Sequence, residues 1–191
     1  MSKRDFLEYL SECLDRFQDE EPFPTPQSLN GRISAAVLVP LLYMDGEWRV
    51  LFIQRSQQVS VHRGQMAFPG GHCELTDLDE RSTALRETEE ELGIKRAQIQ
   101  ILGQMERQPT HQSGFLIRPV VGRLTPDFFL SPDPKEVAQV VTLPLAFFLN
   151  KEACRHSPKG VYYLYGEHHI WGATAAIMQK LALRLQGIVL C

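Results

Sequence analysis

The chain has 191 residues, 43% of them hydrophobic, and carries a formal net charge of −3 at pH 7. Such a chain can bury the core of one domain but is short for two. The small negative charge gives no reason to expect nucleic acid or an anionic membrane as a partner, and no apolar run reaches membrane-spanning length.

The cysteines bear on the cellular compartment. They are scattered along the chain without the spacing of a metal site or a disulfide framework, which suits a reducing environment. The charged start of the chain is not followed by the apolar segment of a secretion signal. We therefore expect a cytoplasmic protein.

The first predicted element is an amphipathic helix over residues 5–17. Its apolar side chains fall on one stripe: Phe6, Leu7, Leu10, Cys13, Leu14 and Phe17. The stripe packs either on the rest of the chain or on a second copy in a homodimer, and the sequence leaves both open. Residues 20–31 contain three prolines and are typical of an extended linker. The chain is thus divided into an N-terminal helix and linker, residues 1–30, and a main domain, residues 31–191.

The main domain begins with two β-rich runs, residues 33–43 and 48–54, and the Asp45-Gly46 turn between them predicts a hairpin. Further strands are expected over residues 99–105, 116–122, 137–143 and 161–165, with a loop at 107–114. Helices are expected over residues 82–92 and 173–185, the second ending before Gly187. This mixture predicts an α/β fold built as a layered sandwich. The aromatic residues assigned to its core are Phe68, Phe115 and Trp171.

Residues 82–92 carry a dense cluster of carboxylates. On a helix with about 3.6 residues per turn, Glu87, Glu90 and Glu91 share one side. Their repulsion costs about 0.2–0.5 kcal/mol per pair, and a bound cation would reverse it. Oxygen ligands without a His or Cys cluster favour Mg²⁺ or Mn²⁺. A solvated acidic helix face is the alternative.

The surrounding residues resemble the signature of the Nudix hydrolases, in which a glycine and a spaced acidic residue precede Arg-Glu-apolar-any-Glu-Glu-any-Gly-apolar. Residues 86–94 match the second half, with Thr88 in place of the apolar residue. In the first half Gly71 is followed by Asp77 rather than Glu, and eight residues rather than seven separate Asp77 from Arg86. The resemblance implies the Nudix fold, an α/β/α sandwich with a mixed β-sheet.

The same Asp and extra residue are typical of the coenzyme A pyrophosphatase branch of this family. That branch also has a Phe-Pro-Gly-Gly lead-in, a Thr-Ala-Leu-Arg-Glu run and an upstream Arg-Ser pair, which occur here at residues 68–71, 83–87 and 55–56. A further Arg of the branch is replaced by Ser60, so a guanidinium suited to bidentate phosphate contact is missing. The similarity extends over residues 34–174.

The resemblance implies a role for each residue of the acidic helix. Glu87 and Glu91 match the family's principal metal ligands, with Glu90 as the third, for Mg²⁺ or Mn²⁺. Arg86 orients Glu90 or forms a plain helix salt bridge with it. Asp77 caps the helix or braces Arg86.

Substrate contacts are expected outside the helix. Gly70 and Gly71 form a turn that lets the backbone approach phosphate or metal, and Arg55 and His62 belong to the upstream motif. For the two glycines the alternative is a simple tight turn. For Arg55 it is a surface salt bridge, and for His62 it is a structural role. Glu136 lies where other Nudix enzymes often supply a distal catalytic Glu and is a candidate general base; a solvated loop carboxylate is its alternative.

On this resemblance we expect hydrolysis of the pyrophosphate bond of coenzyme A or a derivative to 3'-phosphoadenosine 5'-phosphate and 4'-phosphopantetheine. The partner is then a small nucleotide-derived molecule. Ser60 keeps open another nucleoside diphosphate derivative, such as ADP-ribose, a dinucleotide or a damaged nucleotide. A nucleotide-binding sensor without turnover is the third alternative.

Overall fold

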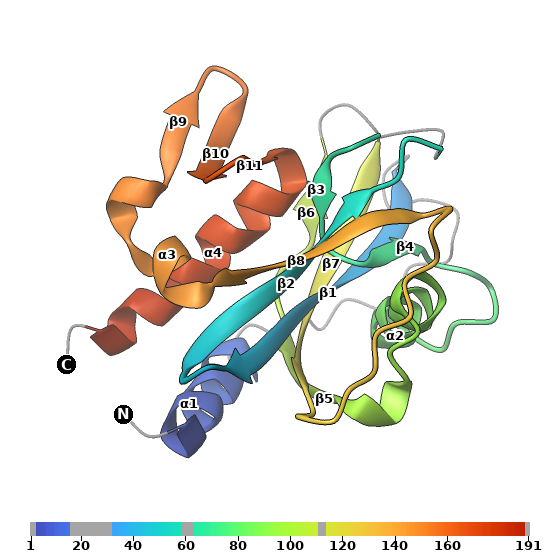
Figure 1. The fold of residues 1–191 in the computed structure, drawn as a ribbon, viewed down its shortest axis with the longest axis horizontal. Coiled ribbons are helices and arrows are strands. Elements are labelled where there is room, and N and C mark those ends of the chain that lie inside the picture. The colour runs from blue at the N-terminus through green and yellow to red at the C-terminus, as the bar shows by residue number, and fades with distance from the viewer. Residues whose placement is uncertain (1–2, 16–31, 59–62, 111–113, 190–191) are drawn as a thin grey trace.

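The computed structural model describes residues 3–15, 32–58, 63–110 and 114–189 (Figure 1). The helices are α1 (Lys3–Asp15), α2 (Glu80–Leu92), α3 (Leu145–Leu149) and α4 (Gly172–Val189), with short 3₁₀ turns at Arg96–Gln98 and Lys151–Ala153. The strands are β1 (Ile33–Met44), β2 (Glu47–Arg55), β3 (Met66–Ala67), β4 (Gly70–His72), β5 (Ile99–Gln104), β6 (Gln108–Pro109), β7 (Phe115–Leu124), β8 (Val137–Pro144), β9 (Arg155–Ser157), β10 (Gly160–Tyr165) and β11 (His168–Trp171).

The main sheet is mixed. Its central path runs β3-β2-β1-β7-β5, while β4 pairs with β1, β6 with β7 and β8 with β2. Strands β1 and β7 are parallel, and the other pairs in this sheet are antiparallel. The predicted Asp45-Gly46 hairpin is confirmed, because both residues have positive φ and the turn joins β1 to β2. A small sheet, β9 to β11, lies apart from it.

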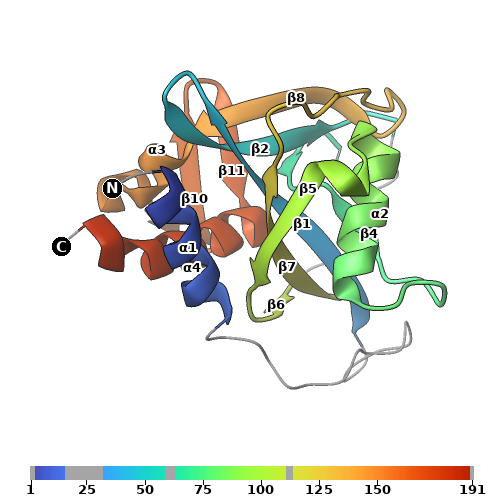
Figure 2. The same cartoon turned by 90° about the horizontal axis from the view of Figure 1, so that it is seen from below.

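Helices cover both faces of the main sheet. Alternate residues of β1 enter opposite cores: Val39 and Leu41 pack with α1, α3 and α4, whereas Leu38 and Leu42 pack with α2. Figure 2 shows α2 on one side of the sheet and the α1 and α4 helices on the other. The predicted α/β/α sandwich with a mixed sheet is therefore confirmed.

Helix α1 contributes to the core of its own chain. Phe6, Leu10 and Leu14 are buried in the cluster shared with α3 and α4, and the Ser11 hydroxyl donates to the carbonyl of Leu102 in β5 at 3.0 Å. The apolar stripe is thus used within the chain. The homodimer stays a prediction, and so does the division at residue 30, since residues 16–31 lie outside the described part.

Some expected boundaries differ from the structure. Helix α4 continues through Gly187 to Val189 rather than ending before that glycine. The expected loop at 107–114 contains the short strand β6, which pairs with β7. Within the described residues, no helix has both the length and the hydropathy needed to cross a membrane.

Candidate active site

Helix α2 is fixed at both ends, which places its carboxylates. Asp79 caps the first turn by accepting from the backbone N–H of Ser82, and the Ser82 hydroxyl accepts from the Asp79 backbone N–H. At the other end Gly93 adopts φ 69°, which favours glycine. The final carbonyls of the helix then accept from the N–H groups of Ser131 and Asp133. The loop that leads to Glu136 is therefore tied to the end of α2.

Arg86 is held by Asp77. Of the two roles expected for Asp77, this contact supports bracing Arg86 rather than capping α2. Its Nε and Nη2 donate to the two carboxylate oxygens of Asp77, each at 3.1 Å, and Nη2 also donates to the His72 carbonyl at 2.9 Å. Burial of Asp77 opposes its ionisation, but hydrogen bonds from Arg86, the backbone and Thr83 hold its pKa below the usual value. Nη1 of Arg86 remains directed at Glu87 (2.9 Å) and Glu90 (3.2 Å).

Glu87 lies against Gly71. A Cβ atom at residue 71 would be 2.5 Å from the Glu87 carboxyl carbon, so a side chain there would displace the carboxylate. Burial raises the pKa of Glu87, an effect that Arg86 partly offsets. Glu90 is more open, with its side chain 58% exposed.

Glu91 is the most buried of the three, with its side chain 6% exposed. One oxygen, Oε2, accepts from the backbone N–H of Gly70 at 3.0 Å, and Oε1 faces Nη1 of Arg55 at 3.3 Å. Burial, opposed by these two contacts, raises its pKa to about 7. Helix α2 therefore does not separate into an exposed acidic face and a buried apolar face as its periodicity predicts, because Glu91 is buried together with Thr88 and Leu92. The Thr88 hydroxyl is satisfied there by donating to the Ala84 carbonyl at 2.6 Å.

A break in the β2–β8 pairing brings Arg55 and Glu136 together. Gln54 pairs with Gln139 whereas Arg55 pairs with Val137, so β8 contains one extra residue at this point. Such a bulge redirects the neighbouring side chains. Nη2 of Arg55 lies 3.6 Å from Oε2 of Glu136, whose side chain is 46% exposed. Residues from β2, α2 and the loop before β8 thus meet at one point.

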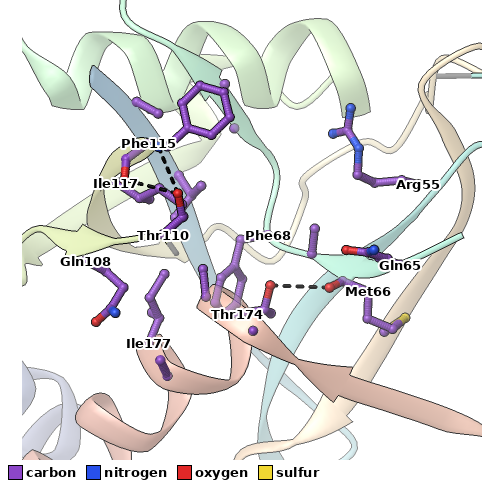
Figure 3. Close-up of a pocket in the computed structure, with 18 of the residues that line it drawn as sticks. Arg55, Gln65, Met66, Phe68, Gln108, Thr110, Phe115, Ile117, Thr174 and Ile177 are labelled. Atoms are coloured by element: carbon purple, nitrogen blue, oxygen red, sulfur yellow. Dashed lines mark hydrogen bonds between the residues drawn. The ribbon is translucent and has the colours of Figure 1, made fainter. Parts of the chain in front are cut away.

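These groups line one cavity of about 700 Å³. Its acidic end contains Arg55, Glu87, Glu90, Glu91 and Glu136 beside Gly70 and Gly71. The rest is formed mainly by β6, β7, β10, β11 and the start of α4, and Figure 3 shows Thr110 and Phe115 on the side opposite Arg55, with Phe68 and Thr174 between them. Phe68 is buried as expected, but Trp171 is wrongly assigned to the core, because it is exposed and lines the cavity.

The carboxylates suit a divalent cation by their chemistry. They offer hard oxygen atoms, and two of them are desolvated anions with raised pKa values, for which a cation is the natural counter-charge. In the present side-chain arrangement Arg86 and Arg55 supply positive charge instead. Within the described residues, no three His, Cys, Asp or Glu side chains converge as a ready-made metal centre. Glu87, Glu90 and Glu91 suit the metal by the chemistry of their oxygen atoms, and their role as ligands stays a prediction.

Two residues of the upstream motif cannot be placed. His62 and Ser60 fall within residues 59–62, outside the described part of the chain. Gly70 and Gly71 both line the cavity, but the predicted turn is wrong, because the two glycines begin strand β4 and pair with β1. The Gly70 N–H is already used by Glu91. Their contact with substrate, like that of Arg55 and His62, stays a prediction.

Sequence reasoning missed a buried ion cluster at the start of α2. The Glu80 carboxylate accepts hydrogen bonds from Nε of Arg107 at 2.8 Å and from Nε of Arg118 at 3.0 Å. All three side chains are buried. Nη1 of Arg118 also donates to the Met105 carbonyl at 2.9 Å. The sequence did contain one sign of this cluster, because Arg118 is a charged residue in the middle of an apolar strand. The cluster joins the first turn of α2 to β7.

Known proteins share this sequence and fold. A family model described as NUDIX domain matches residues 32–162. A protein named uncharacterized Nudix hydrolase NudL from Photorhabdus laumondii subsp. laumondii is 37% identical over 186 residues, covering 93% of this chain and 98% of that protein. A protein of the same name from Pectobacterium atrosepticum is 35% identical over 184 residues, covering 92% and 94%.

Solved structures agree in fold at lower identity. A Nudix hydrolase from M. smegmatis, RenU, gives a TM-score of 0.57 at 19% identity, covering 82% of this chain and 88% of that chain. A C. elegans Ap4A hydrolase in a binary complex gives a TM-score of 0.56 at 19% identity, covering 82% and 97%. These two structures support the fold alone, whereas the family model and the curated relatives cover most of the chain. The chain therefore belongs to the Nudix family.

Proposed function

We propose that the protein hydrolyses the pyrophosphate bond of coenzyme A or one of its derivatives, giving 3'-phosphoadenosine 5'-phosphate and 4'-phosphopantetheine. The observation that carries the proposal is the meeting of three separate motifs at one cavity: Arg55, the glycine pair Gly70-Gly71 of β4 and the carboxylates of α2. These are the segments in which the sequence resembles the coenzyme A pyrophosphatase branch.

Nudix hydrolases generally use a divalent metal, and here Glu87, Glu91 and Glu90 would hold Mg²⁺ or Mn²⁺. The bound metal would supply charge stabilisation at the phosphoryl oxygens and lower the pKa of a water molecule. Arg86, fixed by Asp77, keeps Glu87 and Glu90 on the cavity side of α2. The Gly70 N–H orients Glu91.

Glu136 is the proposed general base. It lines the cavity, is half exposed, and lies across Arg55 from Glu91. A carboxylate in this position can accept a proton from an attacking water, provided that the water lies within hydrogen-bond reach. No covalent protein nucleophile is required.

The remote part of the cavity suits the rest of a coenzyme A molecule. Its wall includes apolar groups such as Ile117, Val161 and Ile177, which can pack against a nucleoside or a pantetheine chain. Lys159, in the turn between β9 and β10, also lines the cavity. Its ammonium group forms no ion pair with the described residues. It could therefore supply a positive charge for a phosphate in a chain that has Ser60 instead of the branch's Arg.

The test is identification of products by mass spectrometry after incubation with coenzyme A, ADP-ribose or diadenosine polyphosphates, in Mg²⁺, in Mn²⁺ and in chelator. Metal-dependent 4'-phosphopantetheine as the main product is the expected result. Selective cleavage of another compound would overturn the coenzyme A assignment in favour of a different nucleoside diphosphate derivative. Binding of nucleotides without cleavage of any would favour a sensor.

A further inference from the structure

Two arginines contact the proposed metal ligands, and they are anchored differently. Arg86 is held from outside the acidic cluster, by two hydrogen bonds to Asp77 and one to the His72 carbonyl. The side-chain polar contacts of Arg55 within the described residues are with Glu91 (3.3 Å) and Glu136 (3.6 Å). Arg86 would therefore keep its place if a cation took the carboxylates, whereas Arg55 would lose a main partner.

Arg55 is also incompletely satisfied. Its side chain is 19% exposed, and its Nε is buried with no hydrogen-bond partner in the described part of the chain. A buried guanidinium that loses a carboxylate is strongly unfavourable unless another anion replaces it. Arg55 lines the cavity (Figure 3), so a phosphate group bound there could replace the carboxylate.

We propose that Arg55 is an exchangeable counter-ion that couples metal binding to phosphate binding. Before metal binds, its guanidinium neutralises Glu91. With a divalent cation held by that carboxylate, Arg55 would lose Glu91 as its partner, pair with phosphate oxygens of the substrate and keep its contact with Glu136. The inference rests on the proposed function only in that a cation binds at Glu87 and Glu91.

The coupling follows from charge and geometry. A guanidinium 3.3 Å from Glu91 Oε1 competes with a metal for the same oxygen, since two cations on one carboxylate repel each other. Phosphate offers the planar fork of arginine two acceptors, so it compensates the released group well. Metal should therefore strengthen phosphate binding, and by linkage phosphate should strengthen metal binding by the same factor.

A purely structural ion pair predicts the opposite. If Arg55 only held Glu91 in a shape that suits the metal, removing it would weaken metal binding. If Arg55 contributed only to the overall charge, any nearby arginine would have the same effect. Arg49 provides the matched control, because it lies on β2 as well but is bound to Glu47 and Thr142 and does not line the cavity.

The first experiment measures Mn²⁺ binding to the full chain by electron paramagnetic resonance at pH 8, with the metal as the sole probe. R55Q should bind Mn²⁺ at least about 5-fold more tightly than wild type, whereas R49Q should not differ. R55K, which keeps the charge, should resemble wild type. Unchanged or weaker binding in R55Q, or equal tightening in R49Q, would overturn the proposal. Circular dichroism of each variant checks that it is folded.

The second experiment repeats the titration with inorganic phosphate, using matched buffer to correct for metal–phosphate association. Phosphate should tighten Mn²⁺ binding in wild type by about 5-fold, and R55Q and R55K should lose most of this gain, because neither has the guanidinium fork. Phosphate without effect on the wild type would overturn the coupling. A protein that binds no Mn²⁺ would instead refute the metal site itself, so the two failures are distinguishable.

Discussion

Gly71 and the carboxylate of Glu87 lie so close that a methyl group at residue 71 would stand 2.5 Å from the Glu87 carboxyl carbon. The two residues belong to different elements, β4 and α2, and the contact is made by a backbone without a side chain. Glycine at this position is therefore a requirement of the acidic cluster.

Gly71→Ala should impair activity far more than stability. The displaced Glu87 carboxylate should lower kcat/KM by about 100-fold, the usual effect of misplacing a catalytic group by about 1 Å. Gly46→Ala is the matched control: Gly46 has φ 85° in the β1–β2 turn, with open space around it. That control should lower the thermal midpoint but leave kcat/KM unchanged. Full activity in Gly71→Ala would contradict the placement of Glu87.

Glu91→Gln should reduce turnover by at least about 100-fold and weaken Mn²⁺ binding, because it removes a proposed charged ligand from the buried end of the cavity. Glu89→Gln is the control on the same helix, where Glu89 pairs with Lys95 and does not line the cavity. Product formation and Mn²⁺ titration measure both variants. Unchanged hydrolysis in Glu91→Gln would refute the site assignment.

In the metal-free protein, the stability that Glu91 contributes should be lost as the pH rises from about 4.5 through about 7. Burial raises the folded-state pKa of Glu91 to about 7, above its ordinary value of 4.5. The folded protein therefore binds the proton more tightly than the unfolded chain does, and stability is greatest below the unfolded pKa. The loss amounts to at most about 3 kcal/mol.

Urea unfolding in chelator across this pH range measures that loss. Glu91→Gln has no proton to exchange, so the difference between wild type and variant isolates the contribution of Glu91. A pH-independent difference would show that Glu91 is not desolvated in the folded protein.

Glu80→Gln should be strongly destabilising although Glu80 lies outside the cavity. It would remove the Glu80 carboxylate that the buried Arg107 and Arg118 both contact, at a cost of about 3–5 kcal/mol. Glu8→Gln disrupts an exposed pair with Arg4 and should change stability by less than about 1 kcal/mol. Denaturant unfolding compares the two, and equal small effects would show that the buried cluster is not energetically coupled.

Lys159→Gln should discriminate between substrates. If Lys159 faces the 3'-phosphate, the variant should lose about 5-fold in kcat/KM on coenzyme A and little on dephospho-coenzyme A, which lacks that group. Lys151→Gln removes an equal charge from a residue that does not line the cavity and should affect neither substrate. Equal losses on both substrates would exclude a specific phosphate contact.

Much of the fold was accessible from the sequence, because local patterns report directly on burial. The continuous apolar, β-rich run of β1 and the Asp45-Gly46 turn each specify a local structure with little dependence on the rest of the chain. Short elements such as β4 and β6 carry too few residues for a periodic signal. Gly187 is tolerated inside α4, so the end of that helix could not be inferred from a glycine.

The candidate site was also predictable only where its residues are close together in the sequence. The clustering of the α2 carboxylates was predicted because their spacing is local, whereas the glycine pair was predicted as a turn and lies in β4. The pairing of Arg55 with Glu91 and Glu136 was not predicted, because it depends on one extra residue in the β2–β8 register. The exposure of Trp171 was missed because composition cannot distinguish a core aromatic from one that lines a cavity.

The packing of α1 and α4 has a practical consequence for truncated proteins. The family match ends at residue 162 and begins at residue 32, yet Leu10, Leu14, Met178 and Leu181 complete one of the two cores from outside those limits. A fragment trimmed to the match would uncover an apolar sheet face, and such surfaces promote aggregation. The segment that the family model matches is therefore smaller than the unit that has to be expressed, and fragments for crystallisation or fusion should retain both flanking helices.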